Sequence, residues 1–164
     1  MIRKAALALT LAGVAACATG PRVSGFRDAD AQISSAALWD ATRMQGNWVA
    51  VAAFPGSDWQ PGTDVRFDWT TPDGRMAFGT AAGPRMVPVT PAGPGRFRRS
   101  DGQPGAAFWV LWVDEGYRTA VIGTPDGSFG FVLNRDAAIP ADRMEAARRV
   151  LDFNGYDLAQ LQVL

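Results

Sequence analysis

The chain has 164 residues, with 16 basic and 16 acidic side chains, no histidine and a single cysteine. A chain of this length forms one domain with a sizeable core, and a lone thiol excludes any internal disulfide bond. The absence of histidine removes the commonest general base and the commonest metal ligand, so we expect neither a metal nor a cofactor.

The N-terminal segment has the pattern of an export signal. The basic start Arg3-Lys4 is followed by an apolar stretch over residues 5–16 that is far too short to span a bilayer. The ending Val14-Ala15-Ala16-Cys17 resembles the lipobox of a bacterial lipoprotein, which implies cleavage before Cys17 and attachment of lipid to its thiol. The alternatives are an ordinary secretory signal with a chance cysteine, or a buried free thiol. Residues 1–16 are therefore predicted to be the signal, 17–29 a tether and 30–164 the folded domain.

The mature chain would carry little net charge. Without its first 16 residues it has no lysine, and 14 arginines face 16 acids, a net charge of −2. This balance argues against a nucleic-acid partner and gives no polybasic attraction to a membrane, so acyl chains would have to provide the anchor. Ala18, which is not an acidic retention residue, favours the outer membrane, with the domain facing the periplasm or the cell surface.

The predicted elements begin with a short helix that Asp30 caps and that runs through Ile33, Ala37 and Trp39. Short strand patterns then follow at the close spacing of an all-β barrel, separated by turns rich in Pro, Asp and Gly. Pro84 and Pro88 lack a backbone donor and are expected at an edge or a bulge. The eight predicted strands lie near 47–54, 63–70, 75–79, 85–89, 95–99, 107–114, 117–124 and 128–135.

One strand needs a cover. The predicted strand 107–114 is apolar on both faces, so its outer face must pack against another element. A helix over 140–154 is available, with Pro140 in its first turn and Asn154-Gly155 as its C-cap. Its apolar stripe at helical spacing consists of Met144, Ala147, Val150, Leu151 and Phe153.

Alternation predicts which strand residues face inward. In the second strand Val65, Phe67 and Trp69 share one face, and charged residues take the other. On the first strand, Ala50 and Ala52 would leave room inside. The predicted inner wall consists of Val65, Phe67, Trp69, Met76, Phe78, Phe97, Phe129 and Phe131.

Three motifs together resemble the conserved skeleton of the lipocalin family: Gly46-Asn47-Trp48, Asp114-Glu115-Gly116-Tyr117 and Arg135. The resemblance covers most of the mature chain and is greatest to the bacterial outer-membrane lipocalins and apolipoprotein D. It implies an eight-stranded up-and-down antiparallel β-barrel over residues 46–135, with a C-terminal α-helix packed on its outside. It also implies that Gly46, Trp48 and Arg135 close the barrel base as structural residues, and that Trp59 belongs to a lid over the open end.

The resemblance implies that the protein binds, carries or sequesters a small hydrophobic ligand, such as a fatty acid or a lysophospholipid. No motif supports enzyme chemistry: Asp114 and Glu115 are neighbours in a turn and point in different directions, and Ser34-Ser35 has no histidine partner. One alternative stays open. In a small barrel the inward aromatics can simply fill the core, which would make the protein a structural or interaction protein of the envelope.

Overall fold

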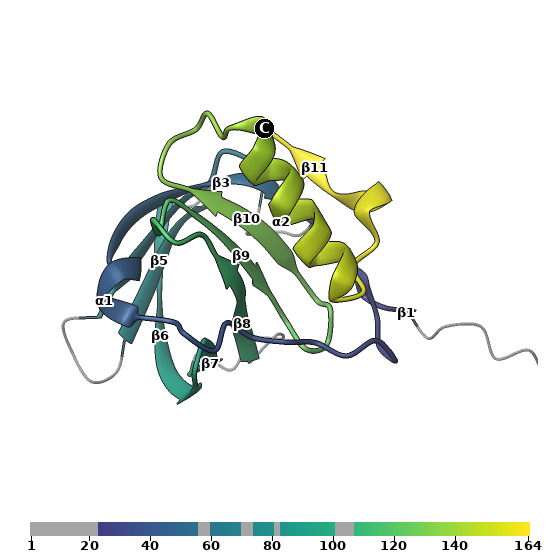
Figure 1. Cartoon of the computed structure of the whole chain (residues 1–164). Coiled ribbons are helices and arrows are strands. Elements are labelled where there is room, and N and C mark those ends of the chain that lie inside the picture. The colour runs from purple at the N-terminus through teal and green to yellow at the C-terminus, as the bar shows by residue number, and fades with distance from the viewer. Residues whose placement is uncertain (1–22, 56–59, 70–73, 81–82, 101–106) are drawn as a thin grey trace, which may run out of the picture.

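The computed structural model (Figure 1) describes residues 23–55, 60–69, 74–80, 83–100 and 107–164. Within these residues eight consecutive antiparallel strands run from β3 to β10, and β10 pairs back onto β3 to close a barrel. The predicted fold class is confirmed. The barrel strands are β3 (Gly46–Ala53), β4 (Asp64–Asp68), β5 (Gly74–Thr80), β6 (Gly83–Gly93), β7 (Arg96–Arg99), β8 (Ala107–Val113), β9 (Thr119–Gly123) and β10 (Gly130–Asn134).

A bulge in β3 changes which alanines face inward. Leu133 of β10 pairs with Ala50, but the preceding residue, Val132, pairs with Ala52, so Val51 is an extra residue on β3. As a result Ala50 and Ala53 pack in the interior cluster, whereas Val51 and Ala52 pack in the cluster outside the barrel. The prediction that Ala52 leaves room inside was therefore wrong.

β6 is longer than predicted, but its prolines lie where a proline is tolerated. Pro84 and Pro88 precede the part of β6 that pairs with β7, which begins at Val89. Pro91 lies at a register shift opposite Phe97. The strand therefore continues through a segment expected to be a turn, because its prolines occupy an edge and a bulge.

The predicted helix over residues 30–39 is absent. The short helix is instead α1 (Ala41–Met44), and Asp40 caps it by accepting a hydrogen bond from the backbone N–H of Thr42 at 2.9 Å. The preceding segment stays non-helical because it is held along the barrel, where the Ala36 N–H donates to the Val110 carbonyl at 2.8 Å. Figure 1 shows this segment running past β8 and β7 to α1.

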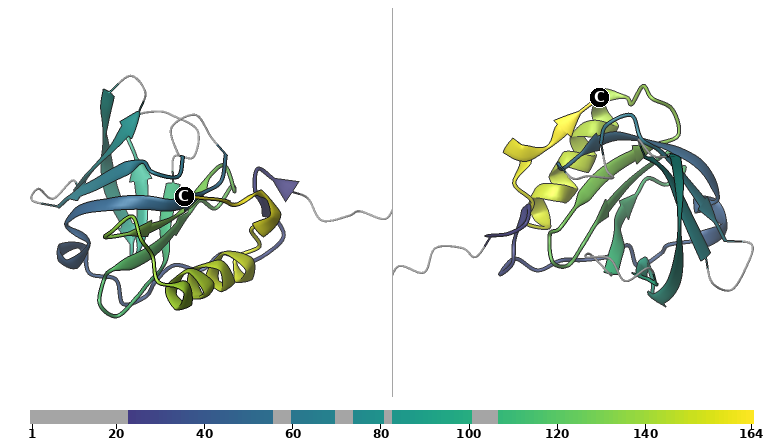
Figure 2. Two further views of the ribbon diagram at one scale, coloured as in Figure 1. Left: turned by 90° about the horizontal axis from the view of Figure 1, so that it is seen from above. Right: turned by 180° about the vertical axis from the view of Figure 1, so that it is seen from behind.

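α2 (Ala141–Phe153) supplies the predicted cover. Its buried residues Ala147 and Leu151 pack in the outer cluster with Leu111 of β8 and Val121 of β9. Figure 2 shows the helix lying on the outside of the barrel. Phe153, predicted to belong to the apolar stripe, is instead 76% exposed. No helix in the described ranges combines the length and the apolarity needed to cross a membrane.

Two described segments, residues 23–28 and the residues that follow α2, lie beside the end of this helix. At the N-terminal side β1 (Val23–Ser24) and β2 (Arg27–Asp28) form a small two-stranded sheet, and Arg27 also bridges to Tyr156. After α2, the turn η1 (Leu158–Gln160) leads to β11 (Gln162–Val163), which pairs with β3. Among the described residues, the segment at 23–28 is joined to the barrel by the Phe26 N–H, which donates to the Gly127 carbonyl, and the C-terminal segment is joined by β11.

Candidate functional site

One end of the barrel is closed by Arg135, which follows β10. Its guanidinium carbon lies 3.8 Å from the centre of the Trp48 ring, a cation–π contact. Trp48 is 1% exposed, and its indole N–H donates to the Met44 carbonyl at 2.9 Å. The structure thus brings Trp48 and Arg135 together at the base. Gly46 lies beside them, because a Cβ placed on Gly46 would be 3.5 Å from Nη1 of Arg135.

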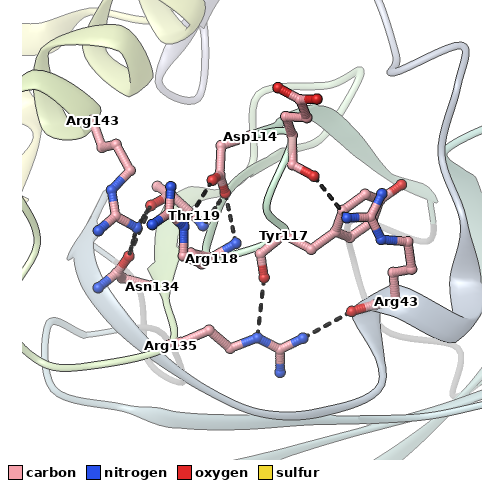
Figure 3. Close-up of polar contacts among 9 residues, drawn as sticks. Arg43, Asp114, Tyr117, Arg118, Thr119, Asn134, Arg135 and Arg143 are labelled. Atoms are coloured by element: carbon pink, nitrogen blue, oxygen red, sulfur yellow. Dashed lines mark hydrogen bonds and ion pairs between the residues drawn. The ribbon is translucent and has the colours of Figure 1, made fainter.

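Arg135 also joins separate segments of the base. It donates to the carbonyls of Tyr117 at 3.2 Å, Gln45 at 3.0 Å, Asn47 at 2.9 Å and Arg43 at 2.8 Å; Figure 3 shows two of these bonds. Burial lowers the pKa of Arg135 from its ordinary value, yet an arginine keeps its charge at neutral pH. The residue is a structural clamp, and its donors are already engaged.

The turn between β8 and β9 is built around Asp114. Its Oδ1 accepts from the backbone N–H groups of Arg118 and Thr119, both at 2.6 Å, and its Oδ2 lies 3.4 Å from the Arg118 side chain. Burial alone would raise the pKa of Asp114, but these hydrogen bonds outweigh it and hold the pKa below its usual range. Glu115 is exposed. The pair is a turn element, and the geometry gives no acid–base arrangement.

An open hollow of about 630 Å³ lies outside the barrel, between α2 and this turn. Sequence reasoning missed it, because only packing places the helix beside the turn. Its charges have both signs, and Arg143 is engaged with Thr119 at 3.0 Å and Asn134 at 3.3 Å. In the described part of the chain no group of acidic, His or Cys side chains could hold a metal ion. The hollow is lined by Trp112, Asp114, Glu115, Gly116, Arg118, Asp142, Arg143 and Ala146.

The predicted inner wall lies inside the barrel but is densely packed. Five of its members, Val65, Phe67, Met76, Phe97 and Phe131, are at most 1% exposed, and Phe129 is 5% exposed. The side chains of a wall around a solvent-filled space would be exposed, whereas these pack against one another in one cluster. Trp69 packs partly buried against the same cluster. Cys17, Trp59 and the side chain of Phe78 fall in the parts that the structure does not describe.

A layer of aromatic rings lies just inside the base. Trp39, which enters from the segment before α1, lies 5.4 Å from Trp69 and 4.9 Å from Phe97, measured between ring centres. Phe97 in turn stacks on Phe108 at 5.1 Å. The indole N–H groups of Trp39 and Trp69 are buried without a hydrogen-bond partner. Alternation could not reveal Trp39, because it is not in a strand.

One cation also faces inward. Arg99 lies two residues after Phe97 on the same face of β7 and is 9% exposed. Arg99 interacts with other groups of the protein. The inner surface is therefore apolar along the described strands, with one arginine on it. Sequence reasoning overlooked this arginine because it stands in the run Arg98-Arg99.

The fold is that of lipocalins. Residues 96–164, from β7 to the C-terminus, match the family described as "Lipocalin-like domain". The chain is similar to insecticyanin from the tobacco hornworm Manduca sexta, with a TM-score of 0.59, 14% identity and 88% of each chain covered. Apocrustacyanin C1 has a TM-score of 0.58 and 11% identity, over 74% of this chain and 76% of that one.

A third similar structure is the siderocalin Ex-FABP, which functions through dual ligand specificities. Its TM-score is 0.54 at 16% identity, over 74% of this chain and 89% of that one. The comparison with curated proteins finds no match. At these identities the likeness establishes the fold.

Proposed function

We propose that this chain is a lipid-anchored lipocalin, allied to the bacterial outer-membrane lipocalins and apolipoprotein D, that binds or carries a small hydrophobic ligand at the cell envelope. The proposed ligand is a fatty acid or a lysophospholipid, and no enzyme activity is proposed. The observation that carries the proposal is the closed lipocalin barrel, whose interior cluster consists of aliphatic and aromatic side chains.

The interior chemistry suits a single acyl chain. Small Ala50 and Ala53 line β3, and Phe131 lies beside Ala53 in the register of β10 with β3. The inward Arg99 is compatible with an anionic head group on such a ligand. A ligand of roughly 20 heavy atoms at about 0.3 kcal/mol each would bind by about 6 kcal/mol, a dissociation constant on the order of tens of micromolar.

A second candidate is favoured by the burial of the inner wall. Because Phe67, Phe97 and Phe131 are at most 1% exposed, the barrel interior is filled at these positions without a ligand. A filled barrel that serves as an envelope structural or interaction protein would need no cavity. Under the carrier proposal, the ligand must displace side chains from their packed positions, which weakens binding relative to a preformed pocket.

A titration with acyl ligands separates the two candidates. Delipidated wild type should show saturable changes in tryptophan emission with long-chain fatty acids or lysophospholipids, because Trp69 packs against the interior cluster. Phe131→Arg should abolish the signal by placing an unpaired charge in the interior, while Phe131→Leu should retain it. Circular dichroism tests whether both variants fold, because the filled barrel predicts that Phe131→Arg unfolds through the loss of a core side chain. No saturable binding by wild type to any chain length would overturn the carrier proposal and support the filled barrel.

The anchor has its own test. Cys17→Ser should convert a membrane-associated protein into an unprocessed or soluble one, because the chain has no other thiol to modify. Metabolic labelling with palmitate followed by membrane sedimentation measures this. Label that persists in the Cys17→Ser protein would show that the lipid is not on this cysteine.

A further inference from the structure

Residues 25–28, which we call the N-terminal arm, are attached to the end of the barrel opposite Arg135. The turn at residues 124–129 joins β9 to β10 at that end. The Phe26 N–H donates to the Gly127 carbonyl at 2.8 Å, and the Arg27 guanidinium donates to the Pro125 carbonyl at 2.7 Å. Gly25, at φ +62°, lies so close to the Gly127 carbonyl oxygen that a Cβ there would clash with it. The arm is therefore held against this end of the barrel, which we call the rim and which the structure describes at the turn 124–129.

The same arm is fixed to the end of α2. Arg27 is 2% exposed and donates to the Asn154 carbonyl at 3.1 Å. The Asp28 N–H donates to the Gly155 carbonyl at 2.8 Å, and the Asp157 N–H donates to the Phe26 carbonyl at 2.9 Å. These bonds hold residues 26–28 at the rim.

Chain length then limits how far the rim can lie from an anchor at Cys17. Residue 17 and the first residue of β1, Val23, are six Cα–Cα steps apart, which span at most about 22 Å. The first turn of α2 lies near the base, where Arg143 donates to Asn134. Its C-cap residue, Asn154, lies at the rim, where its carbonyl accepts from Arg27. The 13 residues of α2 are about 20 Å long, so the base lies farther from the anchor than the rim does.

Each end of the barrel carries an exposed apolar side chain. Phe153, 76% exposed, ends α2 beside the residues that hold the arm. Leu38, 96% exposed, lies near the base, where its carbonyl accepts from the Tyr117 hydroxyl at 3.3 Å. Asp126, Asp152 and Asp157 are exposed around the rim, so a zwitterionic lipid surface suits this end better than an anionic one.

We infer that the rim faces the bilayer at short range, with Phe153 at the level of the lipid head groups, and that the hydrophobic ligand exchanges directly with the membrane. The inference rests on the lipid anchor of the proposed function. It names the partner surface as a zwitterionic phospholipid bilayer and the ligand as a single-chain amphiphile drawn from it.

Site-directed fluorescence tests the orientation. The lipidated protein has no free thiol, so Phe153→Cys and Leu38→Cys each give one labelling position on an exposed side chain. Both are reconstituted on phosphatidylcholine–phosphatidylethanolamine vesicles that contain a head-group spin-labelled lipid. Quenching should be at least about twofold stronger at position 153 than at 38, because the positions are separated by roughly the length of α2. Equal quenching, or stronger quenching at position 38, would overturn the inference.

A lengthened tether provides the matched control. An insertion of about 20 Gly/Ser residues between Gly20 and Pro21 gives a long, flexible tether between the anchor and the domain. The difference in quenching between the labels at positions 153 and 38 should then disappear. A difference that persists would show that the tether does not orient the domain. Vesicle sedimentation and the fatty-acid titration of the soluble domain are measured in parallel. If the protein sediments with vesicles and binds fatty acid, but position 153 is not quenched more than position 38, the orientation alone is overturned. If the protein does not sediment with vesicles, the anchor and the orientation are overturned together.

Discussion

Replacing Arg135 with alanine should lower the free energy of unfolding by about 3 kcal/mol and the melting temperature by roughly 10 °C. The guanidinium lies 3.8 Å from the Trp48 ring centre and donates to four backbone carbonyls. Its removal loses the cation–π contact and leaves carbonyls of the base to be satisfied by water. Urea and thermal unfolding measured by circular dichroism provide the test.

Two further variants identify the cause. Arg135→Lys keeps the charge but loses the fork that reaches several carbonyls, so its effect should fall between those of wild type and alanine. Arg96 also lies over an aromatic ring, 4.3 Å from Trp109, but on the exposed surface, so Arg96→Ala should cost less than about 1 kcal/mol. An Arg135→Ala protein as stable as wild type would show that this residue does not hold the base together.

The barrel strands could be predicted because each leaves a local signal. Period-two alternation around Phe67 and the Pro-Asp-Gly turns specify strand positions within a few residues. The bulge at Val51 leaves no such signal, because residues 50–54 are all buried and both faces of the strand read as apolar. The side to which Ala52 points depends on pairing with β10, which is a tertiary property.

The N-terminal segment shows the limit of capping signals. Asp30 and Asp40 are both competent helix caps, and local sequence does not choose between them. The choice comes from contacts made far along the chain, since the Tyr117 hydroxyl accepts from the Asp40 N–H at 2.8 Å. This placement also brings the Trp39 ring into contact with Trp69 and Phe97. The aromatic layer at the base therefore could not be predicted.

The sequence could predict which strand residues face the barrel interior, but not whether their side chains fill it. Inward residues such as Phe67, Phe97 and Phe131 produce the same alternation whether they line a cavity or fill a core. Their exposure of at most 1% is a packing result that depends on the diameter and shear of the whole barrel. The role of Arg27 was equally hidden, because two of its three acceptors, the carbonyls of Pro125 and Asn154, lie about 100 residues or more along the chain.

Replacing Arg27 with alanine should release the N-terminal arm and destabilise the domain by about 3 kcal/mol, because it leaves buried carbonyls without a donor. Arg27 is 2% exposed and donates to the carbonyls of Asn154, Pro125 and Ala31. Hydrogen exchange should show lost protection at the N–H groups of Phe26 and Asp28, which now bond to the rim turn and to the end of α2.

The matched control for this variant is Arg149→Ala, which removes an exposed arginine paired with Glu145 on the same helix and should change stability by less than about 0.5 kcal/mol. Freeing the arm in Arg27→Ala also lengthens the effective tether, because the next fixed point is the Ser34 N–H bonded to Asn154. The label at position 153 should then lose its excess quenching on vesicles, as with the inserted linker. Unchanged protection at Phe26 and Asp28 in Arg27→Ala would show that the backbone bonds hold the arm without this side chain.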